Sequence, residues 1–225
     1  MFPSYHFLVP GQQDHTGDMK ITMRSLAALS VLGHCATAKT IYTGDIFQGY
    51  PIISSLDIAD VPANQVSRFW LSPGAGQGGL TYFLPIFVGR GTAESCETGR
   101  KLSLSASIHG DELNPVAVVQ KVFAVLNETI AAGDFNGTVI GLPTQNIQGN
   151  LLNQRNFFTS SSNGFFTNLN RVFPGVPVAD GGSLPDAYAD AIWTNVWRNT
   201  SNVDIAVDFR MISCRTRRIL NVTDS

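Results

Sequence analysis

The stretch KLSLSASIHGDELNPVAVVQKVFAVLNETIAAG, residues 101–133, contains the two patterns that decide the fold. Its first part alternates apolar and polar side chains, which is the period of a strand with one buried face. The strand delivers His109 to its carboxyl end, and Glu112 follows in the same turn. The apolar positions of this strand are Leu102, Leu104, Ala106 and Ile108.

A helix is predicted directly after this turn. Asn114 can cap its start, Pro115 suits its first turn, and Gly133 is a typical stop. Between these signals, apolar residues recur at the spacing of one helical face: Val116, Val119, Phe123, Leu126 and Ile130.

The rest of the chain continues this alternation of strand and helix. A second capped helix is predicted over 183–197, and further strands over 66–72, 80–89, 137–143 and 202–209. The order predicts an α/β domain whose ligands bind beyond the carboxyl ends of its strands. The last strand places four apolar residues on one side: Val203, Ile205, Val207 and Phe209.

Three glycines between the first two of these strands, Gly74, Gly76 and Gly79, match the dinucleotide-binding pattern G-x-G-x-x-G. That motif needs a helix after the glycines to direct backbone amides at a pyrophosphate, whereas a β-rich run with Pro85 follows here. We therefore expect a glycine-rich connection between strands and no nucleotide site.

The composition limits the size of the domain and the class of partner. The chain has 225 residues, of which 44% are hydrophobic and 14% charged, and this is enough apolar material for one sizeable core. With 15 basic and 17 acidic residues the net charge is −2, so no basic field exists to hold nucleic acid or an anionic membrane. A small molecule is the expected partner.

The segment MKITMRSLAALSVLGHCATAKT, which begins at Met19, has the layout of a secretory signal peptide. A basic start precedes an apolar run over 26–32 and a small-residue cleavage site, Ala-Thr-Ala, at 36–38. We expect residues 1–18 to be an upstream extension, 19–38 the signal peptide, and the mature protein to be secreted without a membrane segment. The alternative is an ordinary apolar helix in the core.

Glycosylation sequons and cysteines also bear on the compartment. Cys96 and Cys214 remain after the predicted cleavage, and in an oxidising compartment they either pair or stay as unconnected thiols. Sequons that would make the protein a secreted glycoprotein occur at Asn127, Asn136, Asn199 and Asn221.

His109 is the single histidine that remains after this cleavage, because His6, His15 and His34 precede the site. Imidazole and carboxylate are both zinc ligands, and a pair on a turn at a strand end can face one point. A catalytic zinc site needs a third ligand from elsewhere in the chain. By itself, His109 with Glu112 describes a surface histidine beside solvated acids at least as well.

The stretch SIHGDE, together with TQNIQGNLLNQRNFFTSSSNGFFTNLNRVFPG downstream, resembles the succinylglutamate desuccinylase/aspartoacylase family of the zinc carboxypeptidase superfamily. Members of that family show an H-G-x-E zinc motif, an Asn-rich loop with an arginine, and D-L-N-R-x-F-P-G, in this order and at similar spacing. The resemblance spans residues 100–210. It implies a mixed sheet flanked by helices, a Zn²⁺ cofactor, and hydrolysis of the amide (acyl) bond of an N-acyl amino acid or similar carboxylate substrate.

By this resemblance, His109 and Glu112 match two zinc ligands, and Arg155 matches the arginine that polarises the scissile carbonyl and stabilises the oxyanion. Asn170 and Arg171 match the pair that grips a substrate carboxylate. A guanidinium suits both tasks, because its planar fork of donors fits a carboxylate and its charge stabilises a developing oxyanion.

The chain departs from the family pattern in three places. The family's third zinc ligand is a histidine that follows an aspartate after a later strand; here Asp208 matches the aspartate, but Arg210 stands at the ligand position. A cation cannot coordinate zinc, so Asp208 is the nearby group that could complete the site. The family's catalytic glutamate, further downstream, finds no match. Asn168 replaces the aspartate of D-L-N-R and is expected to touch no ligand.

The sequence therefore predicts a secreted zinc-dependent amide hydrolase whose catalytic domain, residues 39–209, is incomplete at its C-terminus. Residues 210–225 read as an aberrant basic tail, either solvated or the product of a faulty gene model. The alternative function is an inactive α/β remnant that binds a carboxylate ligand without turnover.

Cleavage after Ala38 would make Lys39 the first residue of the secreted protein. Expression of the whole chain in a secretory host, followed by mass-spectrometric sequencing of the N-terminus, measures this directly. Ala38→Asp is the control, because a charged residue at the cleavage site should leave the signal peptide attached. Secreted material that begins before Met19 would contradict the prediction.

Overall fold

The computed structural model describes residues 39–74, 76, 79–161, 164–198 and 203–211. Several predicted features lie outside these residues: the N-terminal extension, the signal peptide, Cys214, the sequons at Asn199 and Asn221, and nearly all of the basic tail. Cys96, for which pairing with Cys214 was one prediction, is buried, with its Sγ atom 3.5 Å from the carbonyl oxygen of Gly91.

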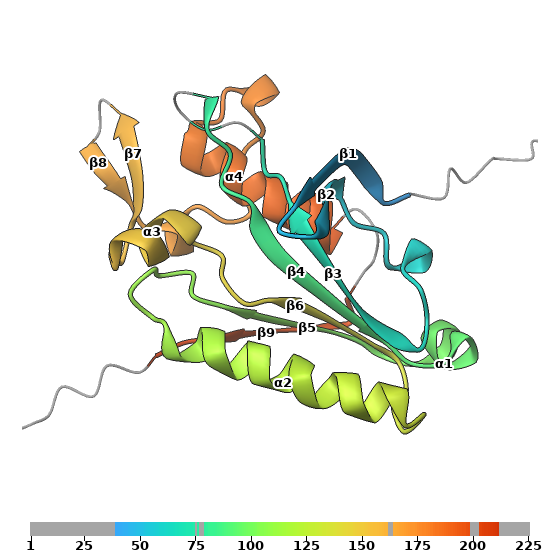
Figure 1. Ribbon diagram of the computed structural model, residues 1–225. Helices are drawn as coiled ribbons and strands as arrows, with labels where there is room; N and C mark the ends of the chain where they lie inside the picture. The colour runs from blue at the N-terminus through green and yellow to red at the C-terminus, as the bar shows by residue number, and fades with distance from the viewer. Residues whose placement is uncertain (1–38, 75, 77–78, 162–163, 199–202, 212–225) are drawn as a thin grey trace, which may run out of the picture. The chain divides into compact units, whose positions relative to one another are not determined.

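The described chain forms a seven-stranded sheet in the order β1-β2-β3-β4-β6-β5-β9 (Figure 1). β6, β5 and β9 run parallel to one another, whereas β4 pairs antiparallel with both β3 and β6. The predicted α/β class with a mixed sheet is confirmed. The strands are β1 (Ile41–Phe47), β2 (Tyr50–Ser55), β3 (Gln65–Leu71), β4 (Leu84–Arg90), β5 (Lys101–Ala106), β6 (Thr138–Leu142) and β9 (Ile205–Phe209).

Helices cover both faces of the sheet (Figure 1). On one face, α2 (Asn114–Ala131) packs Val119 and Phe123 against β5 and β6. On the other, α4 (Leu184–Ile192) continues into a π-helical segment, η5 (Trp193–Arg198), and both pack against β2, β4 and β6. None of the described helices is long and apolar enough to cross a membrane.

Shorter elements complete the described chain. A separate hairpin pairs β7 with β8 and does not join the main sheet. The bounds of the short elements are η1 (Ile58–Asp60), α1 (Ala93–Thr98), α3 (Ile147–Leu152), β7 (Phe157–Ser161), β8 (Gly164–Thr167), η3 (Leu169–Arg171) and η4 (Val178–Asp180).

The alternation in β5 predicted a strand with one buried face, and this was wrong, because both faces are buried. β5 lies between β6 and β9, with α2 on one side and η5 on the other. Ser103 and Ser105 are buried, at 1% and 5% exposure, and both are hydrogen-bonded. Ser103 Oγ accepts from the indole of Trp197 at 3.0 Å, and Ser105 Oγ donates to Asp208 Oδ1 at 2.9 Å. Buried hydroxyls are tolerated because they have partners.

The helix after the turn is confirmed, with a difference at its start. Leu113 occupies the capping position without a side-chain cap, and Asn114 is already the first helical residue. Pro115 follows in the first turn, where its missing N–H leaves no hydrogen bond unmade. Gly133, with φ of 81°, adopts the left-handed conformation that ends many helices.

Two further predictions concern strands. The Gly-rich segment is confirmed as a strand connection, because β3 and β4 are antiparallel neighbours from Gln65–Arg90 to Leu71–Leu84. The prediction that Val203 shares a side with the apolar residues of β9 was wrong. Val203 precedes the strand and packs on the α4 side, whereas Phe209 packs on the α2 side.

The strands β1 and β2 were not predicted. Every residue of β1 is exposed, so its sequence, IYTGDIF, carries no alternation of buried and exposed positions. β2 joins the sheet through parallel pairing with β3, at Ile52–Trp70 and Ile53–Leu71. Such long-range pairing leaves no local signal in the sequence.

The parallel strands bring three chain segments to one edge of the sheet. β5 leads to His109, β6 leads to Gln145, and β9 leads to Asp208 and Arg210. Tyr188 connects α4 to the segment that follows β6. Its hydroxyl donates to the carbonyl oxygen of Gln145 at 2.9 Å. Burial raises the pKa of the Tyr188 hydroxyl well above its ordinary value, so this donor keeps its proton.

Replacing Gly141 with Ala should destabilise the domain by about 1–3 kcal/mol, because overpacking a filled core displaces side chains. A Cβ atom at Gly141 would lie 2.3 Å from the buried ring of Phe123. Gly89→Ala on the neighbouring strand is the matched control, because its Cβ would meet the flexible end of Ile130 at 3.2 Å. Urea unfolding followed by circular dichroism measures both, and equal midpoints for the two variants would contradict the prediction.

Candidate functional site

The turn after β5, which presents His109, has a strained backbone conformation at Ser107. Ser107 has φ of 53°, a left-handed conformation that residues other than glycine rarely adopt. Its hydroxyl donates to the carbonyl oxygen of His109 at 2.9 Å. Asn150 of α3 donates to both Ser107 Oγ and the carbonyl oxygen of Gly110, each at 2.7 Å. Strain of this kind persists where the surroundings over-determine it, which is typical of functional sites.

A close backbone contact sets the position of this turn against α3. A Cβ atom on Gly110 would lie 2.1 Å from the carbonyl carbon of Gly149, so no side chain fits there. The amide of Gly110 also donates to the carbonyl oxygen of Arg155 at 3.2 Å. Together the two contacts place Arg155, which follows α3, next to the turn that contains His109.

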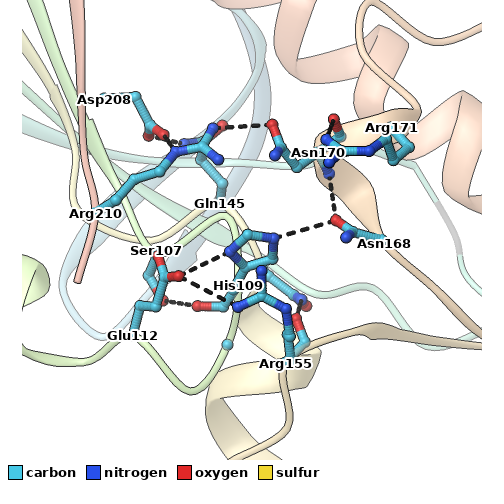
Figure 2. A network of polar contacts seen from close by, with 12 residues as sticks. Ser107, His109, Glu112, Gln145, Arg155, Asn168, Asn170, Arg171, Asp208 and Arg210 are labelled. Carbon is cyan, nitrogen blue, oxygen red and sulfur yellow. Dashed lines mark hydrogen bonds and ion pairs between the residues drawn. The ribbon is translucent and has the colours of Figure 1, made fainter. Parts of the chain in front are cut away.

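The centre of the site is a buried pair of His109 and Glu112. His109 Nδ1 lies 2.8 Å from Glu112 Oε1, and the side chains are 3% and 8% exposed (Figure 2). Arg155 NH1 lies 3.5 Å from the same carboxylate oxygen, and its side chain is half exposed. The other carboxylate oxygen, Glu112 Oε2, is buried and has no hydrogen-bond partner among the described residues.

The second ring nitrogen of His109 contacts the side chain of Asn168. His109 Nε2 lies 3.2 Å from Asn168 Oδ1, and that oxygen also accepts from the amide of Asn170 at 3.0 Å. Because Asn168 Oδ1 is the acceptor in both contacts, His109 Nε2 must carry a hydrogen. His109 Nδ1 then faces the Glu112 carboxylate either with a second proton or with its lone pair directed at a cation.

Asn168 is therefore a site residue that the sequence analysis missed. It was expected to touch no ligand, yet its side chain contacts the ring of His109 and caps η3. The signal was available, because an asparagine two residues before Asn170 can cap a short helical turn. What the sequence did not reveal was that this turn packs against His109.

Zinc is the metal that this family resemblance implies, and the pair fits part of a zinc site. In tetrahedral geometry, two atoms bound to one zinc at about 2.0–2.2 Å lie about 3.3–3.6 Å apart. The His109 and Glu112 atoms, 2.8 Å apart, are at hydrogen-bond distance and would have to separate slightly to share an ion. The unpaired Glu112 Oε2 is a further acceptor that a cation would satisfy. In the described part of the chain, however, no three His, Cys, Asp or Glu side chains form a metal-binding group.

Arg210, at the position of the expected third ligand, links Asp208 to Asn170. Arg210 Nε donates to Asp208 Oδ2 at 2.7 Å, and Arg210 NH2 donates to Asn170 Oδ1 at 2.9 Å (Figure 2). Asp208 Oδ1 accepts from Ser105 Oγ at 2.9 Å and from Gln145 Nε2 at 2.6 Å. The carboxylate of Asp208 is thus engaged on both oxygens, and it is poorly placed to complete a metal site.

The predicted carboxylate-binding pair lies on η3. Asn170 connects to His109 through Asn168 and to β9 through Arg210. Arg171 is exposed, and its guanidinium donates to the carbonyl oxygen of Asn170 at 3.0 Å. The structure therefore brings all five predicted site residues to one edge of the sheet, with His109, Glu112 and Arg155 in direct contact and Asn170 and Arg171 on the adjacent turn.

Comparison with known families and structures agrees with this arrangement. The model of the succinylglutamate desuccinylase/aspartoacylase catalytic domain matches residues 98–210, half of the chain. An aspartoacylase family protein from Mesorhizobium loti is 28% identical, with a TM-score of 0.53 over 69% of this chain and 42% of that chain.

More distant structures share the fold. The succinylglutamate desuccinylase/aspartoacylase from Rhodobacter sphaeroides is 21% identical, with a TM-score of 0.53 over 70% of this chain and 43% of that chain. Carboxypeptidase A from Helicoverpa armigera is 13% identical, with a TM-score of 0.50 over 66% of this chain and 41% of that chain.

The chain spans about two fifths of the length of these three proteins. No curated protein sequence gives a significant match. The matched segment contains all five predicted site residues, together with Asn168 and Arg210. The chain belongs to the succinylglutamate desuccinylase/aspartoacylase family, and its fold is carboxypeptidase-like.

Proposed function

We propose that the protein is a zinc-dependent hydrolase that cleaves the amide (acyl) bond of an N-acyl amino acid or a similar carboxylate substrate. Family and fold suggest a hydrolase of the desuccinylase/aspartoacylase or carboxypeptidase type. The observation that carries the finer proposal is the buried pair of His109 and Glu112, 2.8 Å apart, with Glu112 Oε2 unpaired among the described residues.

In this proposal, His109 Nδ1 and the Glu112 carboxylate hold the zinc ion. A zinc ion supplies a Lewis acid for a carbonyl group and lowers the pKa of water to about 7. Asn168 positions the imidazole, because its acceptor oxygen holds the hydrogen on His109 Nε2 and leaves the Nδ1 lone pair free to face the ion.

Arg155 is proposed to stabilise the oxyanion that develops on the attacked carbonyl. Its guanidinium lies 3.5 Å from Glu112 Oε1, so its positive charge is next to the metal-binding pair. The side chain is 52% exposed, which leaves donors free to turn toward a substrate. A positioned cation beside a developing oxyanion is among the larger contributions to catalysis.

Asn170 and Arg171 are proposed to bind the substrate carboxylate. Arg171 is exposed and anchored through one guanidinium nitrogen to the carbonyl oxygen of Asn170. Its remaining donors form a planar fork that matches a carboxylate. A small-molecule carboxylate is therefore the proposed partner, in line with the absence of a basic field.

A second function is favoured by the bridge of Arg210. Arg210 occupies the place of the expected third ligand and is bonded to Asp208 and Asn170. A site with two metal ligands and three guanidinium groups would bind a carboxylate without turning it over. The alternative function is therefore a carboxylate-binding protein without catalysis.

Secretion is proposed for either function. The first described residues are anchored to the domain, because Thr40 is buried and its amide donates to Asp60 Oδ2 at 2.8 Å. Its hydroxyl donates to the carbonyl oxygen of Asp57 at 2.9 Å. Cleavage after Ala38 would leave these contacts in place. Of the sequons, Asn127 and Asn136 are exposed, as glycosylation requires.

The unmodified chain should retain well below one zinc ion per chain after dialysis, because two ligands do not define a tetrahedral site. Arg210→His should raise the retained zinc several-fold, since it replaces a cation with a ligand next to the pair. The proposed hydrolysis belongs to a protein of this family with a complete site; neither form of this chain should hydrolyse N-acyl amino acids at a useful rate, because the family's catalytic glutamate finds no match among its residues. Metal analysis and an amide hydrolysis assay measure both quantities.

Arg100→His is the matched control for this experiment, because it adds a histidine at the opposite, amino end of β5. It should leave zinc retention unchanged, whereas His109→Ala should abolish whatever zinc Arg210→His gains. Stoichiometric zinc together with measurable turnover in the unmodified chain would show that the metal site lies elsewhere.

Arg171→Ala and Arg171→Lys should each remove selectivity for carboxylate ligands, because neither restores the bidentate fork. Loss of a hydrogen bond to a charged group costs about 1.5–3 kcal/mol, which corresponds to roughly tenfold or more in affinity. Calorimetric titration with a panel of N-acetyl amino acids and the matching amides measures the effect. Equal loss for acids and amides would remove Arg171 from the binding role, and Arg155→Ala, assigned to the carbonyl, should not discriminate between them.

A further inference from the structure

A cavity of about 380 Å³ lies beside Asn170, between the carboxyl ends of β5 and β9 and the segment η5. Its volume is within the range of about 300–1,000 Å³ that is typical of small-molecule sites. The catalytic roles proposed above use its edge, at Asn170, but not its interior.

The interior of the cavity is apolar and largely aromatic. Trp197 packs its ring 6.0 Å from Phe173 and 6.2 Å from Trp193, measured between ring centroids. Trp197 is held by the hydrogen bond from its indole nitrogen to Ser103 Oγ. Ile108, on the chain just before His109, completes this wall. A rigid wall of aromatic rings favours a flat or branched apolar group, because offset and edge contacts add to the burial of area.

The rim of the cavity is polar and positively charged. Arg210 and Asn170 both line it and are joined by the hydrogen bond from Arg210 NH2 to Asn170 Oδ1. The bonds recorded for Arg210 in the described chain use two guanidinium nitrogens, whereas a guanidinium carries five N–H donors. Arg210 is 39% exposed, so its other donors are accessible to a ligand at the rim.

Asp208 is the one acidic residue that lines the cavity, and its charge is neutralised. Its two carboxylate oxygens accept from Arg210, Ser105 and Gln145. Among the described residues that line the cavity, there is therefore no free cation in the interior and no free anion at the rim. An acidic side chain would enter an apolar space without a partner, at a cost of several kcal/mol.

We infer that this cavity is a subsite for an aromatic or branched apolar group of the ligand, so that the preferred N-acyl amino acid is apolar and not acidic. The inference rests on the proposed role of Asn170 and Arg171 in holding the carboxylate. The ligand's carboxylate lies at the rim, on Asn170 and the guanidinium groups, and its apolar group fills the space between Ile108 and the aromatic wall.

The tryptophans of the cavity wall provide a fluorescence signal for ligand binding. The chain has three tryptophans, and two of them, Trp193 and Trp197, line the cavity. Trp70 lies on β3, where its indole donates to the carbonyl oxygen of Phe47. In a Trp70→Phe background, tryptophan emission therefore comes from the cavity alone.

The whole chain with Trp70→Phe is titrated with N-acetyl-L-phenylalanine, N-acetyl-L-phenylalaninamide and N-acetyl-L-aspartate, in the presence of a metal chelator. We expect a saturable change in emission with N-acetyl-L-phenylalanine, at a Kd at least tenfold below that of N-acetyl-L-aspartate. The amide should bind at least fivefold more weakly than the acid. Equal or tighter binding of N-acetyl-L-aspartate, or no saturable change with N-acetyl-L-phenylalanine, overturns the inference.

Two variants of β9 locate the binding. Ala206 lines the cavity, and Ala206→Phe should fill it and raise the Kd for N-acetyl-L-phenylalanine at least tenfold. Val207 is the next residue on the strand and points to the other face, so Val207→Phe should change the Kd by less than twofold. Ala206→Leu replaces Ala206→Phe if circular dichroism shows that the larger residue disturbs folding. Binding that is unchanged by either residue at position 206 would place the ligand outside the cavity.

The titration separates this inference from the proposed hydrolysis. Binding of N-acetyl-L-phenylalanine supports the subsite, and if Arg210→His then fails to raise the retained zinc, the proposed metal site is wrong while the subsite stands. A rise in retained zinc in Arg210→His, in a chain that does not bind the aromatic acid, supports the metal site and removes the subsite.

Discussion

The contact between Gly110 and Gly149 is the constraint on which the site depends. Two backbone segments can approach this closely only where neither carries a side chain. The contact fixes the turn after β5 against α3 and brings Arg155 beside Glu112. Asn150 reinforces it with hydrogen bonds to both sides of His109. A pair of ligand-type side chains is thus held by backbone geometry, and side-chain packing plays a smaller part.

The parallel strands supply the second half of the arrangement. Because β5, β6 and β9 end at one edge, residues more than sixty positions apart, such as Gln145 and Asp208, share a hydrogen bond of 2.6 Å. A chain of hydrogen bonds then runs from His109 through Asn168 and Asn170 to Arg210. The ring of His109 and the end of β9 are therefore linked through the turn η3.

The sequence predicted the elements that depend on residues close together along the chain. The strand β5 and the helix that follows it were predicted from local pattern, although the burial of both faces of β5 was not. The five candidate site residues came from the family resemblance, and their roles stay predictions. Two features depend on distant partners and were not predicted: Ser103 and Ser105 are buried by elements far away in sequence, and Asn168 reaches His109 across the edge of the sheet. β1 pairs with the next strand, β2, but none of its residues is buried, so its sequence carries no alternation.

The bridge of Arg210 creates a conflict between stability and metal binding. Its long side chain ties Asp208 of β9 to Asn170 of η3, and β9 is an edge strand of the sheet. An imidazole is too short to span both partners, so a histidine there would gain a ligand and lose a structural clamp. Such a trade-off is common in proteins, because residues that are needed for activity often lower the stability of the fold around the site. In this chain the position is occupied by Arg210, which links β9 to η3 and is not a metal ligand.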